Sequence, residues 1–110
     1  MADVRRFPCP YLKADVELTP ERERHIVERH PELSEKLIEC LVKIFADPDQ
    51  VRHSSRFANA RLFSRNFEEF WGPKQLVAVV VSQLGPPRHW IITSYLTRRL
   101  SSGELEWTRN

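Results

Sequence analysis

Cationic and titratable side chains gather between Thr19 and Pro31, a stretch with the end signals of a helix and little to bury. Thr19 suits the N-cap, Pro20 suits the first helical position, and Pro31 prevents continuation of the helix. Ile26 and Val27 are the apolar side chains inside these limits, so packing can hold only a narrow edge. A helix this polar suggests a role beyond core packing.

The charged groups of this helix follow its spacing. Arg22, His25 and Arg29 form a row at i, i+3 and i+7, and His30 flanks the apolar edge at Ile26. Guanidinium and imidazole groups beside an anchored edge suit an anionic ligand held between helix and core. A solvated face, on which neighbouring glutamates pair with these cations, predicts the same pattern.

Hydroxyl groups recur on the last apolar strand that the sequence predicts. Thr93, Tyr95 and Thr97 lie at period 2 and therefore on one face, and Arg61 and Arg65 share a face of an earlier strand. If these two faces coincide, guanidinium donors for a phosphate lie beside hydroxyls that orient it. The alternative is that threonine and tyrosine are simply good strand formers and the arginines face water.

Other chemistries lack their motifs in this chain. With 3 glycines there is no phosphate-cradling loop, and there is no H-E-x-x-H or G-x-S-x-G sequence. His25 and His30 are five residues apart, and Cys9 and Cys40 form no Cys/His cluster, so neither a metal nor a disulfide framework is expected. We expect no cofactor.

Histidine, arginine and hydroxyl groups together suffice for metal-independent RNA cleavage. The ribose 2′-hydroxyl attacks the adjacent phosphorus, one group takes its proton, another protonates the 5′-oxygen, and cations stabilise the transition state. We assign proton transfer to His25 and a partner or orienting role to His30. Arg65, with Arg61 or Arg29, is expected to bind the phosphate.

The order of these segments resembles the PBECR family, the phage-associated nucleases related to barnase, EndoU, colicin and RelE-type toxins. The similar stretches are H-I-V-E-R-H-P-E from His25, D-P-D-Q-V from Asp47, A-R-L-F-S-R, L-V-A-V-V-V and W-I-I-T-S-Y, and together they span roughly residues 16–99. The resemblance implies helices packed on an antiparallel sheet and metal-free cleavage of RNA. It places the catalytic pattern on a helical histidine (His25 or His30), Arg65, and a hydroxyl at Thr93 or Ser94.

The sites expected from the residues and the resemblance together form two sets. The catalytic set is His25, His30, Arg65, Thr93 and Tyr95, and the substrate-binding set is Arg29, Arg61, Lys74, Ser94 and Thr97. A non-catalytic module that binds RNA or protein through the same groups remains an alternative, because aromatic residues alternate with arginines from Arg61 to Phe67. A further alternative is an interaction domain whose polar strand at residues 50–55 pairs with an antitoxin, an immunity protein or a second copy of the chain.

The periodicity predicts an α+β fold with two N-terminal helices on a three- or four-stranded antiparallel β-meander. Residues 1–13 are expected to form an arm that packs through Phe7 and Tyr11, and residues 14–110 a single nuclease-like domain. A short strand is predicted at 14–18, a core helix from Glu32 to Phe45, and strands at 50–55, 60–67, 74–83 and 89–97.

Size and charge limit the class of protein. A chain of 110 residues has room for one core, and its apolar runs are too short for a membrane span or a signal peptide, so we expect a cytoplasmic protein. Residues 1–50 hold 8 Lys/Arg against 11 Asp/Glu, whereas residues 51–110 hold 9 against 4. The basic second half is the half expected to face RNA.

Overall fold

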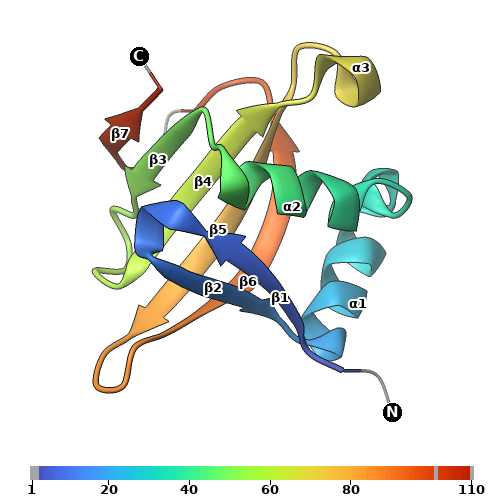
Figure 1. The fold of residues 1–110 in the computed structure, drawn as a ribbon. Helices are drawn as coiled ribbons and strands as arrows, with labels where there is room; N and C mark the ends of the chain where they lie inside the picture. The colour runs from blue at the N-terminus through green and yellow to red at the C-terminus, as the bar shows by residue number, and fades with distance from the viewer. Residues whose placement is uncertain (1–2, 101, 110) are drawn as a thin grey trace.

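The computed structural model describes residues 3–100 and 102–109 and contains one seven-stranded mixed sheet (Figure 1). The strand order is β1-β2-β6-β5-β4-β3-β7. All neighbouring strands are antiparallel except β2 and β6, which are parallel. The elements, in chain order, are β1 (Arg5–Cys9), the 3-10 turn η1 (Pro10–Leu12), β2 (Ala14–Leu18), α1 (Pro20–Arg29), the 3-10 turn η2 (Pro31–Leu33), α2 (Leu37–Ala46), β3 (Gln50–His53), β4 (Ala60–Asn66), α3 (Glu68–Trp71), β5 (Gln75–Gln83), β6 (Arg88–Thr97) and β7 (Glu104–Thr108).

This architecture corrects the predicted three- or four-stranded meander on two helices. The middle of the prediction is right, since β3 to β6 form an antiparallel series with the expected approximate limits. The prediction missed the two edge strands, β1 and β7, whereas the short strand expected at residues 14–18 is present as β2. Pro8 favoured an irregular arm, but β1 is an edge strand, where a missing N–H is tolerated, and it pairs with β2. The short, charged β7 pairs with β3 and gives little periodic signal.

Of the predicted arm, residues 5–9 are therefore a strand of the sheet and residues 10–12 form the turn η1, while residues 1–2 lie outside the described chain. This segment does pack through the two predicted aromatic residues. Phe7 is buried 5.8 Å from the Phe45 ring, and the Tyr11 ring meets Phe63 edge-on at 5.9 Å. The β1–β2 hairpin thus covers part of the same sheet face as α2.

The two main helices differ in the way their sequences predict. Thr19 caps α1 by accepting the Arg22 N–H at 3.2 Å, and Ile26 is the buried residue of that helix. The helix α2 begins at Leu37 and buries five residues. The continuous helix expected from Glu32 is therefore wrong, since the 3-10 turn η2 precedes α2 as a separate element. Its Phe45 packs 5.3 Å from Phe63 of β4.

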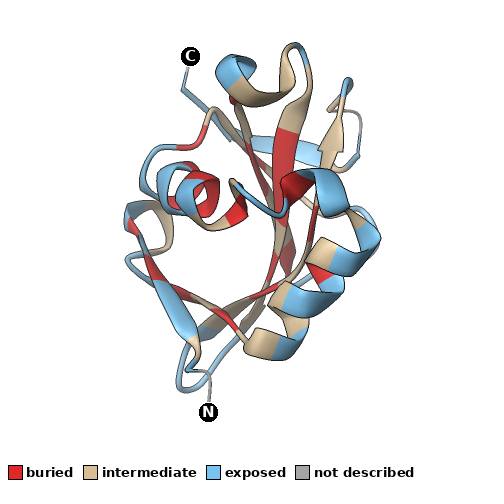
Figure 2. Ribbon diagram, turned by 90° about the vertical axis from the view of Figure 1, so that its right-hand side faces the viewer, coloured by how far each residue is buried: buried red, intermediate tan, exposed pale blue. Residues whose placement is uncertain are grey.

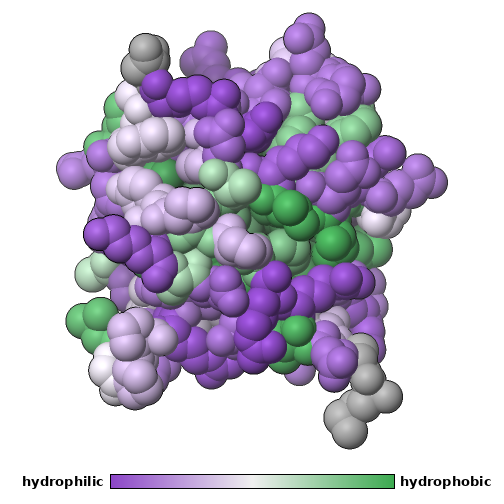
Figure 3. Space-filling view, in the orientation of Figure 1, coloured by the Kyte–Doolittle hydropathy of each residue, from purple (hydrophilic) through white to green (hydrophobic). Residues whose placement is uncertain are grey.

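One sheet face carries the core and the other is largely open. Figure 2 shows the sheet edge-on, with α2 on one side of it and buried residues concentrated between them. On the outside of this covered face, hydrophobic atoms form a central band between hydrophilic groups (Figure 3). Within the described part of the chain, no helix has the length and apolar character needed to cross a membrane.

The connection from β6 to β7 crosses the open face. Because β6 is the third strand in the sheet order and β7 is the seventh, the connection must cross the sheet, and Arg99 and Ser102 of this connection line a cavity together with Ser64 of β4. The connection rejoins the sheet at Gly103, which has φ +75°, and where a Cβ would collide with the carbonyl oxygen of His53. The strand β3 therefore lies between β4 and β7, and it is not the exposed edge expected at residues 50–55.

Candidate functional site

Two adjoining cavities occupy the open sheet face and meet beneath the segment that crosses from β6 to β7. The first has a volume of about 110 Å³ and the second about 270 Å³. Leu62, Tyr95 and Ser102 line both of them. We call the pair the open-face groove.

The register of the strands explains which side chains reach this groove. Ser64 of β4 and Tyr95 of β6 are both paired to Val77 of β5, so the three residues form one row across the sheet. Leu62, Val79 and Thr93 form the next row. Alternation along each strand places all six on the same face.

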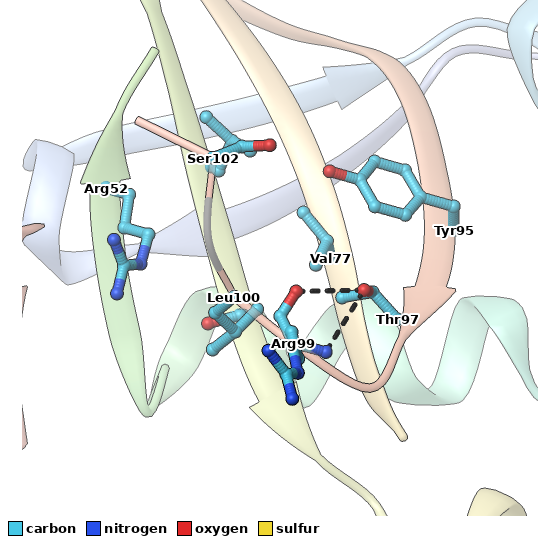
Figure 4. Close-up of a pocket in the computed structure, with 9 residues that line it drawn as sticks. Arg52, Val77, Tyr95, Thr97, Arg99, Leu100 and Ser102 are labelled. Carbon is cyan, nitrogen blue, oxygen red and sulfur yellow. Dashed lines mark hydrogen bonds between the residues drawn. The ribbon is translucent and has the colours of Figure 1, made fainter. Parts of the chain in front are cut away.

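The first cavity combines arginines with hydroxyls. Arg52 of β3 and Arg99 of the crossing segment line it together with Ser64, Tyr95 and Thr97. Figure 4 shows the Tyr95 hydroxyl directed over β5 toward the segment that carries Ser102, with Arg52 on the opposite side. Groups from four separate parts of the chain therefore surround one small space.

Two of these groups are held in place by hydrogen bonds. Arg52 Nη1 donates to the Gly103 carbonyl oxygen at 3.3 Å, and its Nε donates to Gln50 Oε1 at 3.2 Å. These bonds use two of the five N–H donors of the guanidinium, which leaves donors for an anion. Thr97 Oγ1 donates to the Arg99 carbonyl at 2.9 Å and accepts the Arg99 N–H at 3.3 Å, so this hydroxyl fixes the start of the crossing segment.

Ser64 has a property that its neighbours lack. It is 2% exposed, and its Oγ is the buried side-chain oxygen, among the described residues, without a hydrogen-bond partner. An unpaired buried hydroxyl costs about 1–3 kcal/mol. Because Ser64 lines the first cavity, a ligand in that cavity can supply the missing partner.

The groove has a positive electrostatic character. Arg52 and Arg99 line the first cavity and Arg56 lines the second, and no Asp or Glu is among the described residues lining either. In the described chain, none of these three arginines forms an ion pair, whereas Arg61, Arg65 and Arg88 each do. Burial raises the pKa of Tyr95, so its hydroxyl stays protonated at neutral pH and can donate to an anion.

The predicted arginines lie on the other face of the sheet. Arg61 and Arg65 alternate with Leu62 and Ser64, and they share their face with buried Phe63. Arg61 Nε is 2.8 Å from Glu106 Oε1, and Arg65 Nη1 is 3.4 Å from Asp47 Oδ2. The faces that had to coincide for the predicted phosphate site are therefore opposite faces.

Ser94 and Lys74 are also separate from the groove. Ser94 is fully buried on the covered face, and its Oγ donates to the Val77 carbonyl at 2.7 Å. Lys74 follows α3, and its carbonyl oxygen accepts a bond from Asn66 Nδ2 at 3.1 Å. Of the predicted residues, the three hydroxyl residues Thr93, Tyr95 and Thr97 are the ones that line the groove.

The helix α1 packs beside β6, near the edge of this groove. Arg22 Nη1 is 3.5 Å from the carbonyl oxygen of Ile92, a residue that lines the second cavity. His25 and Arg29 are exposed on α1. His30 caps the end of the helix, and its Nδ1 lies 3.8 Å from Glu32 Oε2. The predicted histidines thus lie on the helix side of β6, and neither lines a described cavity.

Sequence reasoning missed a second polar cluster on the covered face. Glu106 of β7 accepts a bond from Tyr11 Oη at 2.6 Å and from Arg61 Nε at 2.8 Å, and His53 Nδ1 lies 3.4 Å away. Burial raises the pKa of Glu106, but the hydrogen bonds from Tyr11, Arg61 and His53 lower it by more. The net pKa of Glu106 is therefore below the ordinary value. The Glu106 carboxylate thus has three hydrogen-bond partners, and the cluster joins β7 to β4 and to the N-terminal hairpin.

Sequence reasoning also missed Arg52, Ser64 and Arg99. Alternation did place Ser64 opposite Phe63, but no local signal showed that the chain after Thr97 would return over this face. Among the described residues, no group of three or more His, Cys, Asp or Glu side chains is arranged to hold a metal ion.

Comparisons with protein-family models, with curated proteins and with solved structures gave no match to this chain.

Proposed function

We propose that the protein binds single-stranded RNA along the open-face groove and cleaves it without a metal ion. The observation that carries the proposal is the convergence of unpaired arginines, hydroxyls and the partnerless Ser64 Oγ in one cavity. Such a set favours a phosphodiester over a neutral ligand.

Phosphate binding is the first step of the proposed mechanism. Arg52 and Arg99 supply charged donors, and Ser64 and Tyr95 supply hydroxyls within the same cavity. Because these groups are positioned before a ligand arrives, they can stabilise the additional negative charge of the transition state. The predicted roles of Arg61 and Arg65 are replaced by Arg52 and Arg99.

Proton transfer is assigned to α1. The helix and β6 run in the same direction in Figure 1, and Arg22 meets β6 at Ile92, just before Thr93. His25 is one helical turn further along the same row as Arg22 and is exposed to solvent, so we assign the proton transfer to it. His30 lies at the end of α1 beside Glu32, and we assign it only a role in orienting the end of the helix.

The reaction is an internal transesterification. The 2′-oxygen attacks phosphorus, the bond from phosphorus to the 5′-oxygen breaks, and the products are a 2′,3′-cyclic phosphate and a 5′-hydroxyl end. His25 accepts the 2′-hydroxyl proton or delivers a proton to the leaving oxygen, and water supplies the complementary step. General acid–base catalysis by such a group contributes about 10²–10⁴-fold.

The test is RNA cleavage in excess EDTA. We expect the wild-type protein to produce cyclic-phosphate ends from a single-stranded RNA and to leave the all-deoxy version uncut. His25→Ala should lower the rate by about 10²–10⁴-fold, whereas Arg24→Ala, an exposed neighbour on α1, should not. Wild-type cleavage by the His25 variant would remove this histidine from the mechanism.

A second function is favoured by one observation. The described residues that line the two cavities include no His, Asp or Glu, so the groove alone can hold a phosphate but cannot shuttle a proton at neutral pH. If no proton-transfer group outside the groove takes part, the protein is a non-catalytic RNA-binding module. Salt-sensitive RNA binding without any cleavage product would identify this function.

A further inference from the structure

The second cavity differs from the first in size and in its lining. Its floor is apolar and is formed by Leu62, Val79 and Ile92 from three adjacent strands. Phe57, from the loop between β3 and β4, lines it and is 56% exposed. The exposed part of this ring is available to stack on a planar ligand in the cavity.

The volumes separate what each cavity can hold. A cavity of about 150 Å³ is large enough to take benzene. The second cavity, at about 270 Å³, therefore accommodates a one- or two-ring heterocycle, whereas the first, at about 110 Å³, does not. The first cavity has the arginines and the partnerless hydroxyl, so it suits the small charged part of the same ligand.

Hydrogen bonds hold the Phe57 loop in this position. Ser54 Oγ accepts the backbone N–H groups of Arg56 at 3.1 Å and Phe57 at 3.2 Å. A side chain that turns the backbone back on itself in this way pre-organises the loop. Thr93, on the opposite side of the cavity, offers a hydroxyl that can bond to the polar edge of a planar ring.

We infer that the second cavity binds one unpaired nucleobase of the RNA, stacked on Phe57, while the adjacent phosphate occupies the first cavity. The inference rests on the proposed function and adds the reason for its preference for single strands. The two cavities share Leu62, Tyr95 and Ser102, so the two parts of one nucleotide fit side by side. A base within a duplex is stacked and paired and cannot enter such a cavity. The groove's positive charge favours a nucleic acid over an apolar protein segment or a second copy of this basic surface.

The test uses DNA oligonucleotides with one internal ribonucleotide, which restricts cleavage to one bond. An abasic residue is placed, in separate oligonucleotides, at the ribonucleotide and at each of its neighbours. We expect one abasic position to lower kcat/KM by about 5- to 150-fold, the range for loss of one base stacked on an aromatic side chain. Affinity measured by fluorescence anisotropy, with a 2′-deoxy version that cannot be cleaved, should fall by the same factor.

Variants of Phe57 link the effect to this cavity. Phe57→Ala should lower the affinity and kcat/KM for the intact oligonucleotide by that factor. The same variant should leave both values unchanged for the oligonucleotide with the sensitive abasic position. Phe57→Tyr should restore both values for the intact oligonucleotide. Leu84→Ala removes another exposed apolar side chain, from the β5–β6 loop, and should have no effect. Equal kcat/KM and equal affinity of the wild type for the intact and all abasic oligonucleotides would overturn the inference that this cavity binds a base, while leaving the proposed function in place. Absence of both binding and cleavage would overturn the proposed function and this inference together.

Discussion

Arg61 Nε donates to Glu106 Oε1 over 2.8 Å, and this contact attaches the last strand of the sheet to its centre. Arg61 belongs to β4 and Glu106 to β7, with β3 between them. The same carboxylate also bonds to Tyr11 of the N-terminal hairpin. An arginine that sequence analysis assigned to substrate is therefore engaged in holding the two ends of the chain together.

Loss of the Glu106 carboxylate should destabilise the fold. We expect Glu106→Gln to lower the free energy of unfolding by about 1.5–3 kcal/mol, the range for hydrogen bonds to charged groups. The folded-state pKa of Glu106 is lowered, so its contribution is present above the ordinary pKa of 4.5 and is lost as the pH falls through the folded value. Urea titrations at pH 7 and below pH 4 measure both effects. Glu104→Gln, on the same exposed strand, should change stability by no more than about 0.5 kcal/mol.

Tyr11 should give the opposite pH dependence. Burial and the bond to Glu106 raise the pKa of Tyr11 from 10.0 to about 12, so the folded state retains a proton that the unfolded state loses. Its contribution is therefore complete below pH 10 and declines as the pH rises toward 12. Thermal unfolding followed at several pH values in this range should show a decline that is absent in Tyr11→Phe. Identical curves for the two proteins would contradict this role.

Two buried serines on opposite sheet faces form a matched pair. Ser64→Ala removes a partnerless hydroxyl, so we expect stability to rise by about 1 kcal/mol while affinity for RNA falls. Ser94→Ala removes the bond to the Val77 carbonyl and should lower stability by about 1 kcal/mol without affecting affinity for RNA. Chemical denaturation and RNA binding by anisotropy separate the two. A loss of stability in Ser64→Ala would mean that its Oγ has a partner in solution.

Arg52 should contribute a phosphate contact. We expect Arg52→Ala to reduce the slope of log affinity against log salt by about 0.7, the value for one phosphate of a single strand. Arg88→Ala is the control, because Arg88 pairs with Glu17 away from the groove. Binding isotherms from low to moderate salt give the slopes. Parallel lines for the wild type and Arg52→Ala would place the phosphate elsewhere.

Ile26 should govern the position of α1. It is the buried residue of that helix, so Ile26→Ala should cost about 2–5 kcal/mol in stability. Because α1 carries His25, cleavage should fall further than RNA binding, which depends on the sheet. Val42→Ala, at a position 47% exposed on α2, should leave both unchanged. Rates and affinities measured well below the unfolding temperature distinguish a displaced helix from an unfolded protein.

The sequence by itself determined the elements whose signals are local. Thr19 and Pro20 define the start of α1, and alternation defines β4 to β6 and the face shared by Thr93, Tyr95 and Thr97. These signals depend on residues within a few positions of one another, where capping and side-chain alternation act.

Only the tertiary structure decided which groups share a site. The β4–β5–β6 register places Arg65 and Tyr95 on opposite faces, and pairing of β7 with β3 draws Arg99 across the open face toward Arg52. The parallel contact of β2 with β6 likewise joins segments more than 70 residues apart. Such pairings arise from burial of a common core and from hydrogen bonds between distant strands, which no short stretch of sequence encodes.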